Sequence, residues 1–491
     1  MISAHLGAGI TRLEMLLGPL LALDCARMQV QPLLEQAWMR LQTLHERIVD
    51  ARLEITDPAA TAAIERAQQA LNTSAATTLA RIDDALEWAF ARCAQPSGDA
   101  ARIRALQALA AAIAFNFRRA SALSEEAAGL AAAPEACWRY RLQQAEFALD
   151  QGREFNDTEA LEALKRLCED ILLPTASAAG AVPAERAWVY DCLGQTLGFL
   201  GRQQSGTANL SRAISVFEAA LELRDRVREP SQWAATQNHL GNAIGSLGQR
   251  QLDTELLERA VNTFEAALEM PVSNAAPDGR ASVHSNLAAL WQTLARQKQD
   301  AGLLERAVAA YQAALAIWTP ERKPLFFATT QANLGAALRL LGDMREDTEL
   351  LAQSVRAYRT ALTIRTRARM PRQWALTQND LGAALQAHGE RAGDALNFGR
   401  AIAAYREALK EIDREGEPMT FAMTLANLAV ARRKLAEYTH DVDVSRRAVA
   451  DIHMALEIFR GASHPRLSEL GLEQLAIAME VNAQLETDEE A

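Results

Sequence analysis

Residues 324–371 read PLFFATTQANLGAALRLLGDMREDTELLAQSVRAYRTALTIRTRARMP, a stretch that begins and ends with proline. The two prolines are 47 residues apart (371 − 324 = 47), and the same interval separates every neighbouring pair in a series of seven. The series is Pro183, Pro230, Pro277, Pro324, Pro371, Pro418 and Pro465. A fixed period between about 20 and 50 residues is typical of repeat architectures. The sequence therefore predicts six stacked units of one structure, followed by the start of a seventh.

Each unit contains two helical patterns. In the first, a leucine precedes a small residue, as in Leu334-Gly335, and the later Gly342 is expected to end the helix. In the second, a small residue lies four positions before a ring, as in Ser354 and Tyr358. A glycine in the middle of a helix lowers helix propensity, and that loss makes sense only if another helix passes close to it. We therefore expect the ring of the second helix to fill the space beside the small residue of the first.

An acidic residue recurs between the two helical patterns. It is found at Asp253, Asp300, Asp347, Asp394 and Asp441. An aspartate directly before a helix can accept hydrogen bonds from the free N–H groups of its first turn. The column therefore indicates helix caps and not catalytic carboxylates.

Together these columns resemble the tetratricopeptide repeat, which has Leu-Gly in its first helix, Ala-x3-Phe in its second and a closing proline. Ala260 and Phe264 match the second element, and the resemblance covers residues 183 to about 486. The period of 47 exceeds the usual length of about 34. It is similar to the long repeats of kinesin light chains and of bacterial proteins associated with CHAT-type peptidases. The resemblance implies an all-α, right-handed α-solenoid of stacked helix-turn-helix units.

The remaining residues fall into four further segments. We predict a helical N-terminal domain over 1–133, or repeats eroded beyond recognition, and a divergent repeat over 134–182. The six regular repeats occupy 183–464, a capping helix 465–486 and a frayed acidic tail 487–491. One apolar stripe and one buried helix, 103–117, support the helical N-terminal domain. The stripe consists of Leu34, Trp38, Leu41, His45 and Ile48.

Composition limits the function. A formal net charge of −11 argues against nucleic acid or an anionic membrane as the main partner, since both require a basic surface. The five cysteines form no C-x-x-C pair, so we expect free thiols, no metal site and no cofactor. No nucleotide-binding or hydrolase motif is present. The N-terminal apolar run is too short to span a bilayer, and a cytoplasmic, non-enzymatic protein is expected.

The resemblance implies that first helices line a concave groove that holds a protein or peptide partner. Asparagine can both donate and accept hydrogen bonds, so a row of them could hold an extended peptide, or could instead bridge neighbouring repeats. The candidate groove residues are Asn238, Asn242, Ser285, Asn286, Gln292, Asn333, Arg339, Asn379, Asn427 and Arg433.

A scaffold or adaptor is the favoured function. One alternative is a sensor or inhibitory regulator of a separately encoded effector, such as a CHAT or caspase-like peptidase. A second alternative is an enzyme with an unrecognised site in residues 1–133. The sequence does not identify the partner or the oligomeric state.

Overall fold

A computed structural model describes residues 40–48, 50–51, 58–71, 78–91, 98–178, 182–270 and 277–490. Within these ranges all regular structure is helical and no strand occurs. Consecutive helices pack on one another, which confirms the predicted all-α solenoid of helical repeats. The chain divides into two compact units, residues 1–279 and residues 280–491.

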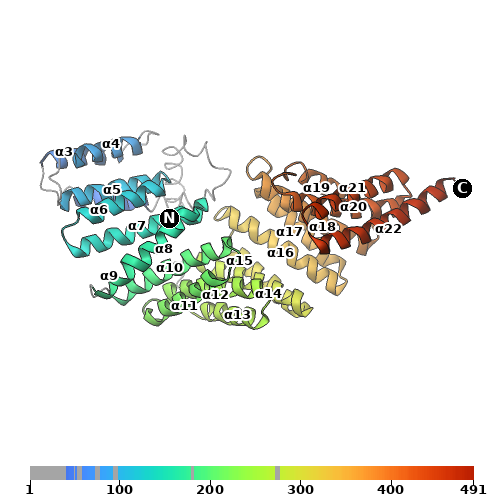
Figure 1. Cartoon of the computed structure of the whole chain (residues 1–491), viewed down its shortest axis with the longest axis horizontal. Helices are drawn as coiled ribbons and strands as arrows, with labels where there is room; N and C mark the ends of the chain where they lie inside the picture. Colours follow the sequence, from blue (N-terminus) through green and yellow to red (C-terminus); the bar gives the residue numbers. More distant parts are fainter. Residues whose placement is uncertain are drawn as a thin grey trace. The chain divides into compact units, whose positions relative to one another are not determined.

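The first unit begins with helical residues 40–48 and 50–51. The helices that follow in Figure 1 are α3 (Pro58–Leu71), α4 (Thr78–Phe90), α5 (Gly98–Ile113), α6 (Phe117–Leu130), α7 (Pro134–Phe155), α8 (Thr158–Arg166), the π-helix η1 (Leu167–Leu172), α9 (Leu173–Ala178), α10 (Pro183–Gln203), α11 (Ala208–Leu223), α12 (Pro230–Gln251) and α13 (Thr254–Leu268).

One hydrophobic core joins the helices of the non-repeating region, from Leu41 to Phe147. Leu41 and Ile48 of the predicted stripe lie in this core and His45 is exposed, whereas Leu34 and Trp38 lie outside the described residues. Most of α5 is buried, as predicted. The predicted helix 103–117 is nevertheless two helices, because the backbone turns at Phe115, which adopts a left-handed φ of 58°.

The second unit contains the later repeats. Its helices are α14 (Pro277–Lys298), α15 (Ala301–Ile317), α16 (Pro324–Arg345), α17 (Thr348–Ile364), α18 (Pro371–Ala392), α19 (Ala395–Ala408), α20 (Pro418–Thr439), α21 (Val442–Gly461) and α22 (Pro465–Glu490). From α15 onward each helix packs on the next (Figure 1). First helices also contact each other, α16 with α18, α18 with α20 and α20 with α22, so they share one side of the array.

The glycines of the Leu-Gly column receive the rings of the second helices. A Cβ atom on Gly335 would lie 2.9 Å from the ring of Tyr358, and one on Gly241 would lie 2.8 Å from the ring of Phe264. Tyr358 and Phe264 are almost fully buried. The two helices of a repeat therefore approach so closely that a side chain at the glycine would overlap the ring.

Every aspartate of the acidic column caps a second helix. Asp347, for example, accepts hydrogen bonds from the backbone N–H groups of Glu349 at 2.8 Å and Leu350 at 3.2 Å. The same arrangement occurs at Asp253, Asp300, Asp394 and Asp441. This confirms the predicted capping function, since each side chain satisfies N–H groups that lack a partner within the helix.

The predicted ends of the first helices were wrong by about one turn. The helix containing Gly248 continues to Gln251, and the left-handed residue is Leu252, with φ of 57°. Asp253 then donates its backbone N–H to the Gly248 carbonyl at 2.9 Å, as in the common glycine-ended helix. Close packing explains the glycine at this position, because a Cβ atom added at Gly248 would lie 3.0 Å from Leu257 of the second helix.

Candidate functional site

The ten predicted groove residues lie on α12, α14, α16, α18 and α20. Nine of them are half-buried and Arg433 is buried. The first helices therefore do present these polar side chains, but their hydrogen bonds decide how many could bind a ligand.

Two asparagines in the row join neighbouring repeats. Asn427 on α20 donates its Nδ2 to Oδ1 of Asn379 on α18 at 3.3 Å. At the same 48-residue separation in the first unit, His239 Nδ1 lies 3.2 Å from Asp191 Oδ1. The bridging alternative therefore describes Asn379 and Asn427 in this structure.

A second column of groove residues contacts partners within its own repeat. Tyr311 donates its hydroxyl to Gln292 Oε1 at 3.3 Å. Arg339 Nη1 lies 3.1 Å from Asp343 Oδ2, one helical turn later. Arg433 forms the equivalent ion pair with Glu437. A ligand at these positions would have to compete with existing hydrogen bonds.

Three groove residues remain available. Asn242 of the first unit and Ser285 and Asn333 of the second have no side-chain hydrogen bond within the described part of the chain. Asn238 and Asn286 are engaged in other interactions. The ten candidates thus include fewer open polar side chains than the sequence indicated.

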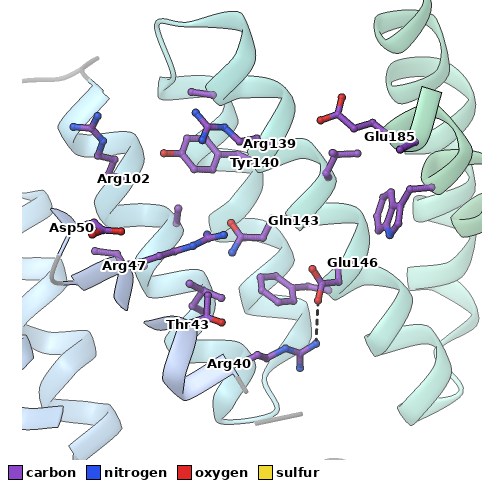
Figure 2. A pocket seen from close by; sticks show the side chains of 18 of the residues that line it. Arg40, Thr43, Arg47, Asp50, Arg102, Arg139, Tyr140, Gln143, Glu146 and Glu185 are labelled. Atoms are coloured by element: carbon purple, nitrogen blue, oxygen red, sulfur yellow. Dashed lines mark ion pairs between the residues drawn. The ribbon is translucent and has the colours of Figure 1, made fainter. Parts of the chain in front are cut away.

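The first unit contains a cavity of about 940 Å³ that the sequence did not indicate. It lies among helical residues 40–48 and 50–51, α5, α7, α10 and the segment that leads from α11 into α12 (Figure 2). Its charged side chains are Arg40, Arg47, Asp50, Arg102, Arg139, Glu146, Glu185, Arg224 and Glu229. Five arginines thus face four carboxylates in a chain whose overall charge is strongly negative.

Two of the cavity arginines are open to a ligand. Arg47 and Arg139 have no ion-pair partner within 4.0 Å among the described residues. Arg47 extends from its helix toward Gln143 of α7, and Arg139 projects from α7 beside Tyr140 (Figure 2). Their two guanidinium groups are therefore presented from separate helices.

Arg40 is held in place by its neighbours. It forms an ion pair with Asp150 and lies 3.6 Å from Glu146 Oε1. Its guanidinium also lies 5.1 Å from the ring centroid of Phe117 and 5.4 Å from that of Phe147. Such contacts fix the side chain and make it part of the cavity wall.

Unsatisfied polar atoms also lie in the wall. Gln143 is more than nine-tenths buried, and its Oε1 has no hydrogen-bond partner within the described structure. The same holds for Nε of Arg224, whose Nη1 approaches Glu229 Oε2 only to 3.9 Å. Buried polar atoms normally have a partner, so these two atoms indicate a place where a polar ligand could bind.

Glu146 is the carboxylate most affected by the cavity. Its side chain is 55% exposed because it lines the hollow, yet protein surrounds it on several sides. This burial raises the pKa of Glu146 above its ordinary value and Asp150 acts in the same direction, while Arg40 opposes the shift. Acid therefore neutralises Glu146 more easily than it neutralises an ordinary glutamate.

Sequence reasoning missed all of these cavity residues. Arg40, Arg47 and Arg102 belong to the region without a repeat period, and Arg139 belongs to the divergent unit. The available signal was local: Arg40 and Arg47 are seven positions apart and so share a helical face. Nothing in the sequence showed that α5 and α7 would place further arginines opposite that face.

Other chemical groups are scarce in the described residues. They contain no cluster of three or more histidine, cysteine, aspartate or glutamate side chains arranged to hold a metal ion. Cys137, Cys168 and Cys192 are free thiols. Over the same residues, no helix combines the length and hydrophobicity needed to cross a bilayer.

Residues 327–362 match a family model described as Tetratricopeptide repeat. No curated protein matches the chain. Several solved structures are similar in fold. The C-terminal part of a TPR repeat-containing protein from Cytophaga hutchinsonii has 12% identity and a TM-score of 0.40, covering 68% of this chain and 99% of that one.

Two further structures have the same kind of similarity. BtubC (BKLC) from P. vanneervenii has 18% identity and a TM-score of 0.35, covering 52% of this chain and 92% of its own. The apo form of the quorum sensor NprR from B. thuringiensis has 14% identity and a TM-score of 0.43, covering 79% and 97%. The ring-and-glycine columns and paired helices agree with the family match, so residues 327–362 form a tetratricopeptide repeat within an array of similar helix pairs.

Proposed function

We propose that the chain is a non-enzymatic scaffold that binds a protein partner through an acidic peptide segment, held in the cavity of the first unit. One observation carries the proposal: the cavity presents Arg47 and Arg139 without ion-pair partners in the described structure, next to the unsatisfied Oε1 of Gln143. Its volume of about 940 Å³ is within the range of ligand sites.

The chemistry of the lining favours a peptide. A guanidinium binds a carboxylate through two parallel N–H donors, so Arg47 and Arg139 suit aspartate or glutamate side chains. Gln143 Oε1 requires a donor, which a peptide N–H supplies. The net charge of −11 opposes a nucleic-acid backbone, whose binding requires a broad basic surface.

The lining also favours binding over catalysis. Its described residues include no serine, cysteine or histidine, the side chains of the commonest nucleophile and base pairs. An enzyme hosted by residues 1–133 is therefore the weaker hypothesis. Regulation of a separately encoded effector is a narrower form of the same binding function. Identifying the partner would distinguish a regulator from a general scaffold.

The groove residues stay a prediction for a second contact surface. Ser285 and Asn333 could bind the backbone of a peptide directly, whereas Asn379, Asn427 and Arg339 would first have to leave their present partners. We expect replacement of Ser285 and Asn333 by alanine to weaken partner binding less than replacement of the two cavity arginines.

The test uses a fluorescein-labelled peptide of alternating glutamate and alanine and the full chain, with fluorescence anisotropy as the readout. Combining Arg47→Ala with Arg139→Ala should weaken binding by tenfold or more, equivalent to about 1.4 kcal/mol. Arg81→Ala is the matched control, because Arg81 is an exposed arginine of α4 outside the cavity. Equal binding by the double variant and the wild type would refute the proposal.

A further inference from the structure

The cavity of the first unit has charges of opposite sign at its two ends. Arg47 and Arg102 lie at one end, and Glu185 of α10 lies at the other, with α7 between them (Figure 2). Glu229 also lines the cavity and directly precedes α12, which contacts α10. The open arginines account for an acidic ligand group, but they do not explain what the carboxylates of the second end would bind.

A later repeat shows what the carboxylate of Glu229 lacks. Glu417 holds the same position before α20 (417 − 229 = 188, four periods of 47). Arg372 of α18 donates its Nε to Glu417 Oε1 at 2.7 Å and its Nη2 to Oε2 at 2.9 Å. The position of Arg372 is occupied in α10 by Ala184 (372 − 184 = 188), an exposed residue that lines the cavity. The guanidinium that binds Glu417 therefore has no counterpart at this position beside Glu229.

Arg224 does not replace the missing guanidinium. Its Nη1 approaches Glu229 Oε2 only to 3.9 Å, and this oxygen is buried without a hydrogen-bond partner in the described structure. The Arg224 side chain is itself more than nine-tenths buried, and its charge also acts on the buried Asp191. Glu229 makes no side-chain hydrogen bond that caps α12. Because a buried acceptor without a donor is unfavourable, this carboxylate indicates a cationic ligand group.

Two side chains of α10 also suit a cation. Glu185 and Trp188 line the cavity, and their spacing of three positions places them on one face of the helix. Glu185 Oε2 accepts a hydrogen bond from Nε1 of Trp138 at 3.0 Å, but this carboxylate has no ion-pair partner among the described residues. The half-buried Trp188 provides an indole face, which attracts a guanidinium.

The repeat itself does not require an indole at this position. The equivalent residues of the later repeats are Ala235, Ser282, Thr329, Leu376 and Met423. None of these has a ring, so Trp188 is a feature of the cavity and not of the repeat core.

We infer that this second end of the cavity binds an arginine side chain of the acidic peptide, with its guanidinium on the Glu229 carboxylate and close to the indole of Trp188. The inference rests on the proposed function, because the open arginines hold the acidic residues of the same peptide. Arginine suits the site better than lysine, since Arg372 binds the equivalent carboxylate through two donors. The recognised segment thus contains acidic residues and one arginine.

The test uses the full chain and a series of fluorescein-labelled glutamate–alanine peptides that carry one arginine at increasing distance from the glutamates. Each peptide has a twin with citrulline, which keeps the shape of arginine but has no charge. At the best spacing the arginine peptide should bind about fivefold more tightly than its twin, because charge-assisted hydrogen bonds are stronger than neutral ones. Fluorescence anisotropy measures both affinities.

Two variants should remove this preference. Glu229→Gln removes the charge that the arginine binds, and Ala184→Arg supplies a guanidinium from the chain itself, as Arg372 does for Glu417. The matched controls are Glu222→Gln, at an exposed glutamate of α11, and Ala450→Arg, at an exposed alanine of α21. Both controls lie outside the cavity lining and should keep the preference. Circular dichroism verifies that each variant is folded.

The outcomes separate this inference from the proposed function. Equal binding of the arginine and citrulline peptides at every spacing, or a preference that survives in Glu229→Gln, would overturn the inference alone. Binding of the plain glutamate–alanine peptide that does not depend on Arg47 and Arg139, or no binding of any peptide, would overturn the proposed function and the inference with it.

Discussion

The repeats of the second unit and the cavity of the first use polar side chains differently. In the repeats, Arg339 pairs with Asp343, Arg433 with Glu437, and Asn427 with Asn379. In the cavity, Arg47 and Arg139 have no ion-pair partner among the described residues. The repeats therefore engage these polar side chains in internal contacts, whereas two of the cavity arginines have no ion-pair partner among the described residues.

The difference follows from periodicity. A repeated column places the same side chains at the same distance in each unit, so a favourable internal contact recurs along the array. The cavity lies between the region without that period and the first regular repeats, and its arginines come from helices that are far apart in the sequence. Regular columns in this protein mainly hold the array together, and the irregular part offers the better ligand site.

The largest effect is expected from filling the receiving position of a complete repeat. Gly335→Leu should destabilise the fold by about 1–3 kcal/mol, since even a Cβ would lie 2.9 Å from the Tyr358 ring. Gly241→Leu should have a comparable cost. Thermal melting monitored by circular dichroism measures both.

The control is Gly399→Leu, at a helical glycine where a Cβ would meet nothing within 4 Å. That variant should melt at the same temperature as the wild type or higher, because leucine favours helix more than glycine does. Equal melting of the Gly335→Leu and Gly399→Leu proteins would show that the repeats do not depend on close helix contact.

The next effect concerns the ends of the first helices. Leu252 adopts a left-handed conformation although it is not glycine, and its side chain is 77% exposed. Leu252→Gly should stabilise the protein by about 0.5–1 kcal/mol, because the steric cost of this conformation outweighs the extra entropy that glycine loses. Urea denaturation monitored by circular dichroism gives the difference.

Two equivalent positions sharpen this test. Gly393→Leu should be destabilising, since it introduces the conformation that Leu252→Gly removes. Glu346→Gly should gain less than Leu252→Gly, because Glu346 also pairs with Arg391 at 2.8 Å. A loss of stability in Leu252→Gly would contradict the conformational argument.

The sequence predicted the parts of the fold that depend on neighbours within one repeat. The aspartate caps, the proline starts and the ring-and-glycine contacts each join residues less than 47 positions apart, so their columns carry the signal. The predicted ends of the first helices were too early because Gly342 was interpreted as a helix terminator, whereas it makes room for Leu351. Sequence alone does not distinguish these two uses of glycine.

The candidate site was not predictable in the same way. Arg47 and Arg139 are 92 positions apart (139 − 47 = 92), and only the packing of α5 and α7 with residues 40–51 places them around one cavity. The groove candidates lie on first helices and stay a prediction, and their internal partners depend on rotamers of Tyr311, Asp343 and Glu437. A single substitution at a neighbouring position decides whether such a side chain has an internal partner or can bind a ligand.

A smaller effect tests the electrostatics of the cavity. Because Glu146 repels an acidic ligand and the pKa of Glu146 is raised, lowering the pH from 7 toward 5 should strengthen binding of the glutamate–alanine peptide. The peptide remains charged through most of this window, since the ordinary glutamate pKa is about 4.3. Glu146→Gln should strengthen binding about threefold at pH 7, worth about 0.7 kcal/mol, and flatten the pH dependence.

Glu222→Gln, at an exposed glutamate of α11 outside the cavity lining, is the control and should leave both affinity and pH dependence unchanged. Weaker binding by Glu146→Gln would mean that this carboxylate orients Arg40 for the ligand and does not repel it. The comparison of open and paired arginines would then have to include Arg40 among the ligand-binding groups.

The smallest effect concerns Asp380 of α18, which accepts a hydrogen bond from the groove candidate Asn379. Burial raises the pKa of Asp380, while the hydrogen bond from Asn379 and the charges of Arg339 and Arg365 oppose the shift. A carboxyl whose pKa is raised by folding binds its proton more tightly in the native state, so its ionised form destabilises the fold at neutral pH. Asp380→Asn should therefore raise the melting temperature at pH 7. The gain in stability should be less than about 1 kcal/mol, because neighbouring protein covers only part of this residue and the rest is open to solvent.

The sign also fixes the pH dependence. The advantage of Asp380→Asn should be complete above the raised native pKa and should vanish as the pH falls below about 3.9, the ordinary aspartate pKa, where Asp380 is protonated in both states. Asp488→Asn, at an exposed aspartate near the end of α22, should show no such dependence. An advantage that persists at pH 3.5 would indicate that the amide gains a hydrogen bond, as Asn427 does with Asn379, and that the column is stabilised by bridging more than by loss of charge.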